Sequence, residues 1–356
     1  MKRAVIILLL AGLITSFFYF AFRKKPDAAL EPAPELLTLL PKDVTGVAYL
    51  DLAAIRASQF WREAGGAIPA PQRDADFQRF VTETGFDYER DLDRVAVAWR
   101  STNVPHGELP AIAIAEGRFD RAKIRAYATR NGKVENASGT EIFRFVQNEK
   151  QPRDGEEVML LAFLSDTRIV LAETTPANQA RFLAFVQSPP AAQPFPEKVQ
   201  QQLQGVAGAA LFAVARVVPA SRNASQPGWN FAPLQQMQGV DWMTIAARPE
   251  HDRLRLQIEA EAAGTLKAMQ LGVLLDGFKM MITAALRNPS TENGLSQKEN
   301  DVLLKLVEAA RTARDGNRLQ VRMELTPELV RILAARAQRE AQEERRSDSP
   351  EQPRSR

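Results

Sequence analysis

The chain has 356 residues, of which 45% are hydrophobic and 25% are charged, and it contains no cysteine. This composition is typical of a globular protein and excludes disorder throughout, while the length favours two globular units over one core. The lack of cysteine excludes disulfides, thiolate nucleophiles and iron–sulfur ligation. Five basic residues precede residue 26, so the formal charge of +3 becomes about −2 for residues 26 to 356. The body of the protein is therefore not basic, which argues against binding of nucleic acid.

Residues 4 to 22 form a run of 19 residues without a charge. As a helix this run covers about 30 Å, the thickness of the hydrocarbon core of a bilayer. The run ends in Phe20 and Phe22, followed by basic residues, which favours an uncleaved anchor over a signal peptide; the stretch PDAAL at 26 to 30 offers an alternative cleavage site. We therefore predict a signal-anchor in residues 1 to 25 that contacts the lipid bilayer through residues 4 to 22.

The charges on the two sides of this run nearly balance, so they do not decide its orientation. An N-terminal signal-anchor is the usual means of export. We therefore expect a single-pass protein of the inner (cytoplasmic) membrane, with its body facing the periplasm or outside.

Four prolines, Pro26, Pro32, Pro34 and Pro41, disfavour helix and predict a spacer over residues 26 to 43. The first lobe is predicted over residues 44 to 187. Its expected strands are 47–52, 94–100, 111–116, 141–146, 158–165 and 168–173, and its expected helices are 53–63, 74–84, 117–132 and 177–186.

A proline-rich stretch predicts a linker over residues 188 to 206. A second lobe, 207 to 342, then repeats the order of elements: a strand at 208–217, a short helix and a strand pair up to about 262, a helix at 263–286, a helix at 298–313, a strand at 318–325 and a helix from Thr326-Pro327. Residues 343 to 356 are expected to be a disordered charged tail. The predicted fold is α+β: a transmembrane helix and two similar lobes, each a mostly antiparallel sheet with helices on one face.

Acidic residues occur at every second position in GFDYERDLD, namely Asp87, Glu89, Asp91 and Asp93. An EF-type calcium loop requires glycine at position 6 and glutamate at position 12, but counting from Asp87 these are Leu92 and Ala98. We interpret the stretch as a corner in which Gly85 ends a helix, Phe86 packs back onto it, and the carboxylates accept hydrogen bonds from free amides.

Other catalytic signals are weak. His106 and His251 lie in predicted turns, and the sequence has no zinc spacing, nucleophile elbow, phosphate loop or dinucleotide fingerprint. Asp51 is predicted to cap the helix that begins at Ala53. We therefore assign no catalytic, cofactor-binding or metal-binding residues. Paired carboxylates stay open as an alternative, because such pairs need only spatial proximity.

The helix predicted at 263–286 carries a stripe of apolar residues at helical spacing, and Lys267, Asp276 and Lys279 argue against a second membrane span. The stripe either fills the core of the second lobe or lines a groove for an acyl chain or a partner helix. The candidate groove residues are Leu271, Leu274, Leu275, Phe278 and Ile282.

Three stretches carry a family resemblance: LLPKDVTGVAYLDLAAIRASQFWRE at 39 to 63, TGFDYERDLDRVAVA at 84 to 98 and GRFDRAKIRAY at 117 to 127. Through them the first half of the chain resembles uncharacterised bacterial envelope proteins with an N-terminal membrane anchor and a domain of unknown function. These are packing and turn motifs. The resemblance implies a membrane-tethered, extracytoplasmic body without catalytic activity.

Two hypotheses of function follow. The first is a membrane-tethered binding or scaffold protein whose partner is an envelope protein or an acyl chain. The alternative is an envelope hydrolase that uses paired carboxylates, which requires two acidic side chains about 5 to 10 Å apart in a cleft.

Overall fold

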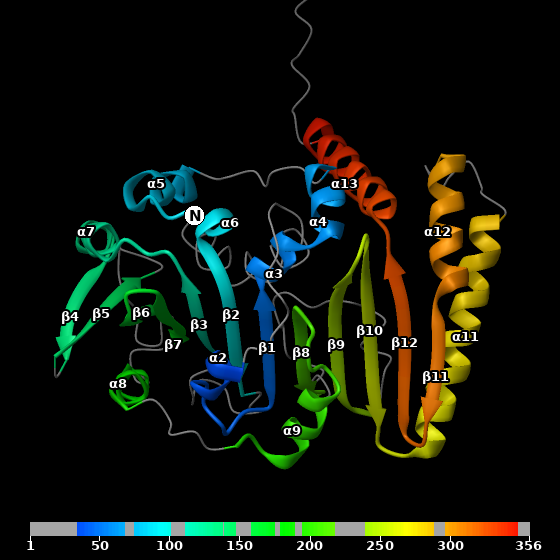
Figure 1. Ribbon diagram of the computed structural model, residues 1–356, viewed down its shortest axis with the longest axis horizontal. Coiled ribbons are helices and arrows are strands. Elements are labelled where there is room, and N and C mark those ends of the chain that lie inside the picture. Colours follow the sequence, from blue (N-terminus) through cyan, green and yellow to red (C-terminus); the bar gives the residue numbers. More distant parts are fainter. Residues whose placement is uncertain are drawn as a thin grey trace, which may run out of the picture.

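The computed structural model describes residues 34–67, 75–100, 111–137, 139–146, 158–174, 179–188, 194–217, 239–287 and 296–347. The predicted anchor at residues 4 to 22 and His106 lie outside these residues. Within them the chain has the predicted α+β composition with antiparallel strands (Figure 1).

Twelve strands form one antiparallel sheet in the order β11-β12-β10-β9-β8-β1-β2-β3-β7-β6-β5-β4. The strands are β1 (Gly46–Asp51), β2 (Leu92–Trp99), β3 (Ala111–Gly117), β4 (Lys133–Ala137), β5 (Thr140–Val146), β6 (Val158–Ser165), β7 (Arg168–Thr174), β8 (Leu211–Arg216), β9 (Val240–Glu250), β10 (Arg253–Ala262), β11 (Arg311–Asp315) and β12 (Arg318–Leu325).

The helices lie between these strands and at both ends of the described chain. They are α2 (Pro34–Thr38), α3 (Leu52–Ala57), α4 (Gln59–Ala64), the short 3₁₀ helix η1 (Gly65–Ala67), α5 (Ala75–Thr84), α6 (Tyr88–Asp91), α7 (Arg121–Asn131), α8 (Gln179–Gln187), α9 (Glu197–Gln204), α11 (Thr265–Arg287), α12 (Gln297–Ala309) and α13 (Pro327–Ser347).

The two predicted halves meet at a continuous seam in the sheet. β1 pairs with β2 on one side and with β8 on the other, and Tyr49 lies opposite Phe212. The prediction of a separate sheet in each half is therefore wrong. β1 and β8 are apolar strands, and an apolar edge strand left open would pair with other molecules. Their mutual pairing removes both edges.

Helices cover both faces of the sheet in the first half, which corrects the expectation of one covered face. Val47 and Tyr49 pack against α2, α8 and α9 in one buried cluster, whereas Leu50 lies in a second cluster with Phe60 and Trp61 of α4. Alternate residues of a strand point to opposite faces. β1 therefore contributes to both cores, and its sequence is almost continuously apolar instead of alternating.

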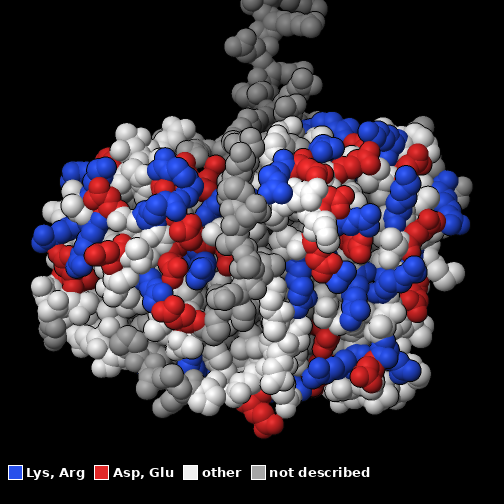
Figure 2. Space-filling model, in the orientation of Figure 1, with Lys and Arg blue, Asp and Glu red and all other residues white. Residues whose placement is uncertain are grey.

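In the second half, α11, α12 and α13 lie on one face and α9 lies on the other. Ala260 and Leu319 pack under α11, while the intervening side chains of β10 and β12 point to the opposite face. That opposite face is charged, and its residues pair across strands, as in the 3.4 Å contact of Arg318 with Glu259. Figure 2 shows acidic and basic residues interspersed over these strands.

Three predicted boundaries differ from the structure. Residues 34 to 43, expected to end the spacer, belong to the body, because Leu36 and Leu40 are buried in the core. The end of the predicted linker forms α9, whose Val199 is buried on the same face as Leu36. α13 continues to Ser347, beyond the expected start of the tail at residue 343.

Candidate functional site

The corner before β2 has the predicted geometry. Gly85 has a φ of +72° and donates its N–H to Val81 O, which ends α5, and Phe86 packs edge-to-face on Phe80 at 6.3 Å. The side chain of Asp87 accepts a hydrogen bond from the N–H of Glu89 at 3.0 Å, which caps α6. The corner prediction is therefore confirmed for these residues.

Arginines bind two further carboxylates of the corner, those of Asp91 and Asp93. Arg90 donates to Asp91 at 2.6 Å, and the buried Arg56 donates to Asp93 at 2.8 Å and to Leu92 O at 2.7 Å. Burial alone raises the pKa of Asp91, but hydrogen bonds from Arg90 and from the N–H of Asp87 outweigh it and hold the pKa below its ordinary value. These carboxylates fix α3 and α6 to the start of β2.

Asp51 caps α3, as predicted, by accepting a hydrogen bond from the N–H of Ala54 at 2.7 Å. Its other carboxylate oxygen accepts a hydrogen bond from the Tyr49 hydroxyl at 3.2 Å, and burial raises the pKa of Tyr49. Arg94 lies between Asp51 and Glu116, at 3.7 Å from each carboxylate. A guanidinium thus lies between the two acids of this pair.

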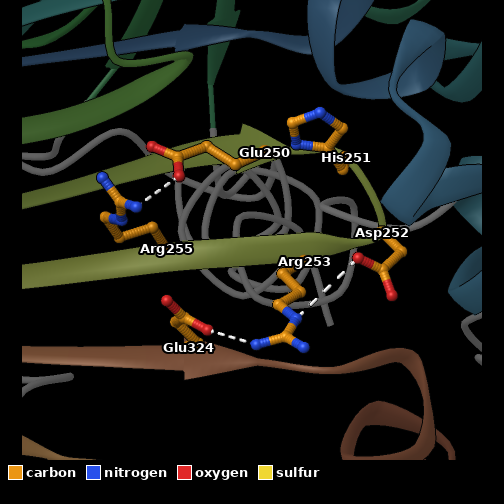
Figure 3. Close-up of a pocket in the computed structure, with 6 residues that line it drawn as sticks. All are labelled: Glu250, His251, Asp252, Arg253, Arg255 and Glu324. Carbon is orange, nitrogen blue, oxygen red and sulfur yellow. Dashed lines mark hydrogen bonds and ion pairs between the residues drawn. The ribbon is translucent and has the colours of Figure 1, made fainter.

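A hollow at the β9–β10 turn collects another group of charges (Figure 3), formed by Glu250, His251, Asp252, Arg253, Arg255 and Glu324. Arg253 bonds Glu324 at 2.7 Å and lies 3.8 Å from Asp252, while Arg255 bonds Glu250 at 2.5 Å. His251 has a φ of +54° at the turn, and its carbonyl accepts the N–H of Phe60. The ion pairs of the hollow therefore join β10 to β9 and β12, and the backbone bond from Phe60 connects the turn to α4.

The hydrolase hypothesis requires a carboxyl that stays protonated near neutral pH, and therefore a raised pKa. Among the described residues, the carboxyls whose pKa is shifted are all shifted downward; they are Glu35, Asp91, Asp120, Glu261 and Glu299. Each of them is bonded to an arginine, a lysine or a backbone N–H. These residues do not supply the general acid that the hypothesis needs.

The five predicted groove residues form one stripe on α11 but differ in burial. Leu271 is buried against Leu319, and Leu275 is partly buried against the same cluster. Leu274 and Phe278 are exposed, and Ile282 is half-buried. The five residues therefore do not line one groove. Leu271 and Leu275 fill the core under the helix, and Leu274 and Phe278 belong to its outer surface.

The outer surface of α11 is the feature that sequence reasoning missed. Leu266, Val273 and Met280 recur at intervals of seven residues and are 64%, 70% and 73% exposed. Seven of the eight exposed large hydrophobic side chains among the described residues lie on α11. We call this surface the α11 face and define it by Leu266, Met269, Val273, Leu274, Phe278, Met280 and Met281.

The α11 face is continuous along the helix and carries few charges. Between Leu266 and Met281 the helix rises about 22 Å at 1.5 Å per residue. α11 is also the one described helix that is long and apolar enough to cross a membrane, yet only 6% of its most apolar 18-residue window is buried. A core helix would have most of that window buried. The α11 face is therefore a candidate interaction surface.

Polar contacts fix the inner side of α11 to the body. Lys279 donates to the carbonyl of Ala310 at 2.7 Å, and Arg287 bonds Glu308 at 2.6 Å. These contacts bind α11 to the C-terminal end of α12, where cations and exposed carbonyls attract each other. Figure 1 shows α11 and α12 along one end of the molecule, beside β11. α11 is therefore bonded to the body on its inner side and exposes its apolar side to solvent.

The fold and this surface define an α+β protein built on one antiparallel sheet, with an exposed apolar helix at its end. No protein-family model and no curated protein matches the chain. Among solved structures, crystal form III of TP0453 is 9% identical, with a TM-score of 0.42, over 87% of this chain and 100% of that chain. Crystal form I gives 8% identity and a TM-score of 0.40 over 85% and 97% of the two chains. Scores of this size establish neither a common fold nor a common function.

Proposed function

We propose that the chain is a membrane-tethered, extracytoplasmic binding protein of the inner membrane, without catalytic activity, whose binding surface is the α11 face. The observation that carries this proposal is the exposure of seven large apolar side chains on one helix. Water-exposed apolar surface is unfavourable by about 25 cal/mol per Å², so a continuous face of this kind favours a bound state.

The apolar run at residues 4 to 22 supports the tether. Eleven residues, 23 to 33, separate that run from Pro34, where the described body begins. At about 3.3 to 3.6 Å per residue, this connection spans at most about 40 Å. A body of this size therefore stays within about one molecular diameter of the bilayer. The tether and the binding surface then act at the same place.

We also infer that the body consists of two similar halves, each contributing one block of strands to the sheet. The support is the strand order, in which β1-β2-β3-β7-β6 runs away from the seam as β8-β9-β10-β12-β11 does. The flanking helices follow the same order, since α2 precedes β1 and α9 precedes β8, both on one face. In this description α11 occupies the place of α7.

Fractionation of cells that express the full chain tests the tether. The chain should remain in the membrane pellet after alkaline carbonate extraction, and an epitope at its C-terminus should be digested by protease in spheroplasts but not in intact cells. A matched chain without residues 4 to 22 should be released into the soluble fraction. A full-length chain found in the soluble fraction would refute the proposal.

A further inference from the structure

We infer that the α11 face binds the lipid bilayer itself, as a helix lying in the plane of the membrane interface. This inference rests on the proposed tether and names what covers the face. α11 cannot cross the bilayer while the sheet is intact. Its own residues Ala268 and Leu271 are buried against the sheet, and its Lys279 bonds Ala310 O on the inner side. The inner side stays on the sheet and the outer side enters the interface.

The width of the α11 face favours lipid over a single partner helix. At 100° per residue, the exposed apolar side chains from Met269 to Phe278 cover an arc of about 180°. A helix pair needs only a narrow seam of two positions in seven. Lipid can cover the whole arc because its acyl chains adapt to any surface. Methionines such as Met280 and Met281 suit such a fluid partner, since their side chains are flexible.

The charges on α11 fit the same surface. Besides Lys279, which bonds Ala310 O on the inner side, the helix carries two exposed basic residues, Lys267 and Arg287, and one acidic residue, Asp276. Interfacial helices combine an apolar side with basic residues that attract anionic headgroups. Lys267 lies in the first turn and Arg287 in the last, so both ends of the apolar stretch have a cation.

The position of α11 relative to the predicted anchor allows this contact. The described chain starts at α2, and in Figure 1 both α2 and the first turn of α11 lie at the lower side of the sheet. The connection of residues 23 to 33 spans at most about 40 Å, so the body is held at high effective concentration next to the bilayer. A weak interfacial helix then suffices to dock the body.

The test uses the cysteine-free sequence, in which one introduced cysteine gives a single labelling site. The full chain is reconstituted in vesicles of phosphatidylcholine and phosphatidylglycerol, with Val273→Cys or Met280→Cys carrying an environment-sensitive fluorophore. Leu333→Cys is the matched control, because Leu333 is an exposed apolar residue of another helix, α13. We expect labels at 273 and 280 to be blue-shifted, quenched by lipid-borne quenchers and several-fold less accessible to iodide than the label at 333.

Two outcomes would overturn the inference. In the first, the chain resists carbonate extraction but the labels at 273 and 280 are as accessible to iodide as the label at 333. This result would show that the α11 face is exposed to water. Protection that depends on the protein-to-lipid ratio, with disulfide cross-linking through residue 273, would show that a second copy covers the face. Loss of the chain from the vesicles in carbonate would instead refute the tether.

Discussion

At the corner before β2, the carboxylates of Asp87, Asp91 and Asp93 have different nearest partners. Asp87 caps α6, Asp91 binds Arg90, and Asp93 binds Arg56. The spacing of two residues suggested a shared ligand, but the short helix α6 turns the side chains in different directions. The turn could be predicted from two observations. Leu92 and Ala98 stand where a calcium loop requires glycine and glutamate, and Gly85 stands where a helix can end.

Close backbone contact at this corner explains Gly117, the buried last residue of β3. A Cβ on Gly117 would overlap with the carbonyl of Asp91. We therefore predict that Gly117→Ala lowers the free energy of unfolding by about 1 to 3 kcal/mol, as overpacking does. Gly66→Ala is the control, since a Cβ there meets nothing within 4 Å. Thermal unfolding in mild detergent measures both, and equal stability of the two variants would contradict the contact.

Glu261 forms a buried polar group with Lys198 and Gln202 under α9, with bonds of 2.5 and 2.8 Å. Burial raises the pKa of Glu261, but the hydrogen bond and charge of Lys198 outweigh it, and the net pKa lies below its ordinary value. A carboxyl whose pKa is lowered by folding stabilises the protein above its unfolded pKa of about 4.3, and this stabilisation is lost as the pH falls through the folded pKa.

We predict that Glu261→Gln lowers the free energy of unfolding by about 1 to 3 kcal/mol at pH 7. The difference from the wild type should begin to shrink as the pH falls below about 4, where the carboxyl of the unfolded state is protonated, and it should disappear below the lowered pKa of the folded state. Glu324→Gln breaks an exposed pair with Arg253 and should cost less than about 1 kcal/mol. A difference for Glu261→Gln that persists unchanged at low pH would contradict the ionised state of Glu261.

At the scale of elements, the strands with β-branched and aliphatic residues were predictable. β6 and β12 have the predicted bounds, Val158–Ser165 and Arg318–Leu325. β11 was missed and assigned to the preceding helix, because its sequence RTARD has no large apolar residue and all five of its residues are exposed. Only pairing with β12 defines it as a strand. β11 is therefore a strand because it pairs with β12, and its residue pattern alone does not predict a strand.

The candidate site was predictable only in part for a related reason. An apolar stripe on a helix predicts either a core face or an open groove, and the residue pattern from Leu271 to Ile282 does not distinguish the two. The sequence does not show that the body covers one side of α11 alone. The positions of Ala268 and Leu271 over Leu319 decide which residues remain outside.

Two leucines one turn apart on α11, one buried and one exposed, test this arrangement. We predict that Leu271→Ala lowers the free energy of unfolding by about 2 to 5 kcal/mol, because Leu271 is buried against the sheet. Leu274→Ala removes the same atoms from an exposed position and should change stability by less than about 0.5 kcal/mol. Thermal unfolding in detergent measures both. The opposite order would mean that α11 is docked through its other side.

For the whole molecule, the seam between β1 and β8 makes one body of the two halves. Phe212 stacks on Tyr49 across this seam with ring centroids 5.5 Å apart, and both side chains are buried. The same cluster contains residues of α2, α8 and α9, which come from both halves. A break at the seam therefore exposes apolar surface of each half. We expect the two halves to unfold together instead of in two steps.

Hydrogen exchange measured by mass spectrometry tests this cooperativity. Phe143 is buried in β5, on the far side of the first half from the seam. We predict that Phe143→Ala lowers the free energy of unfolding by about 3 to 5 kcal/mol. It should accelerate exchange in β10 and β12 as well as in β5 and β6, because slowly exchanging core amides open through global unfolding. Phe212→Ala should give the same pattern from the seam. Faster exchange confined to the first half in Phe143→Ala would show that the halves unfold independently, despite their shared sheet.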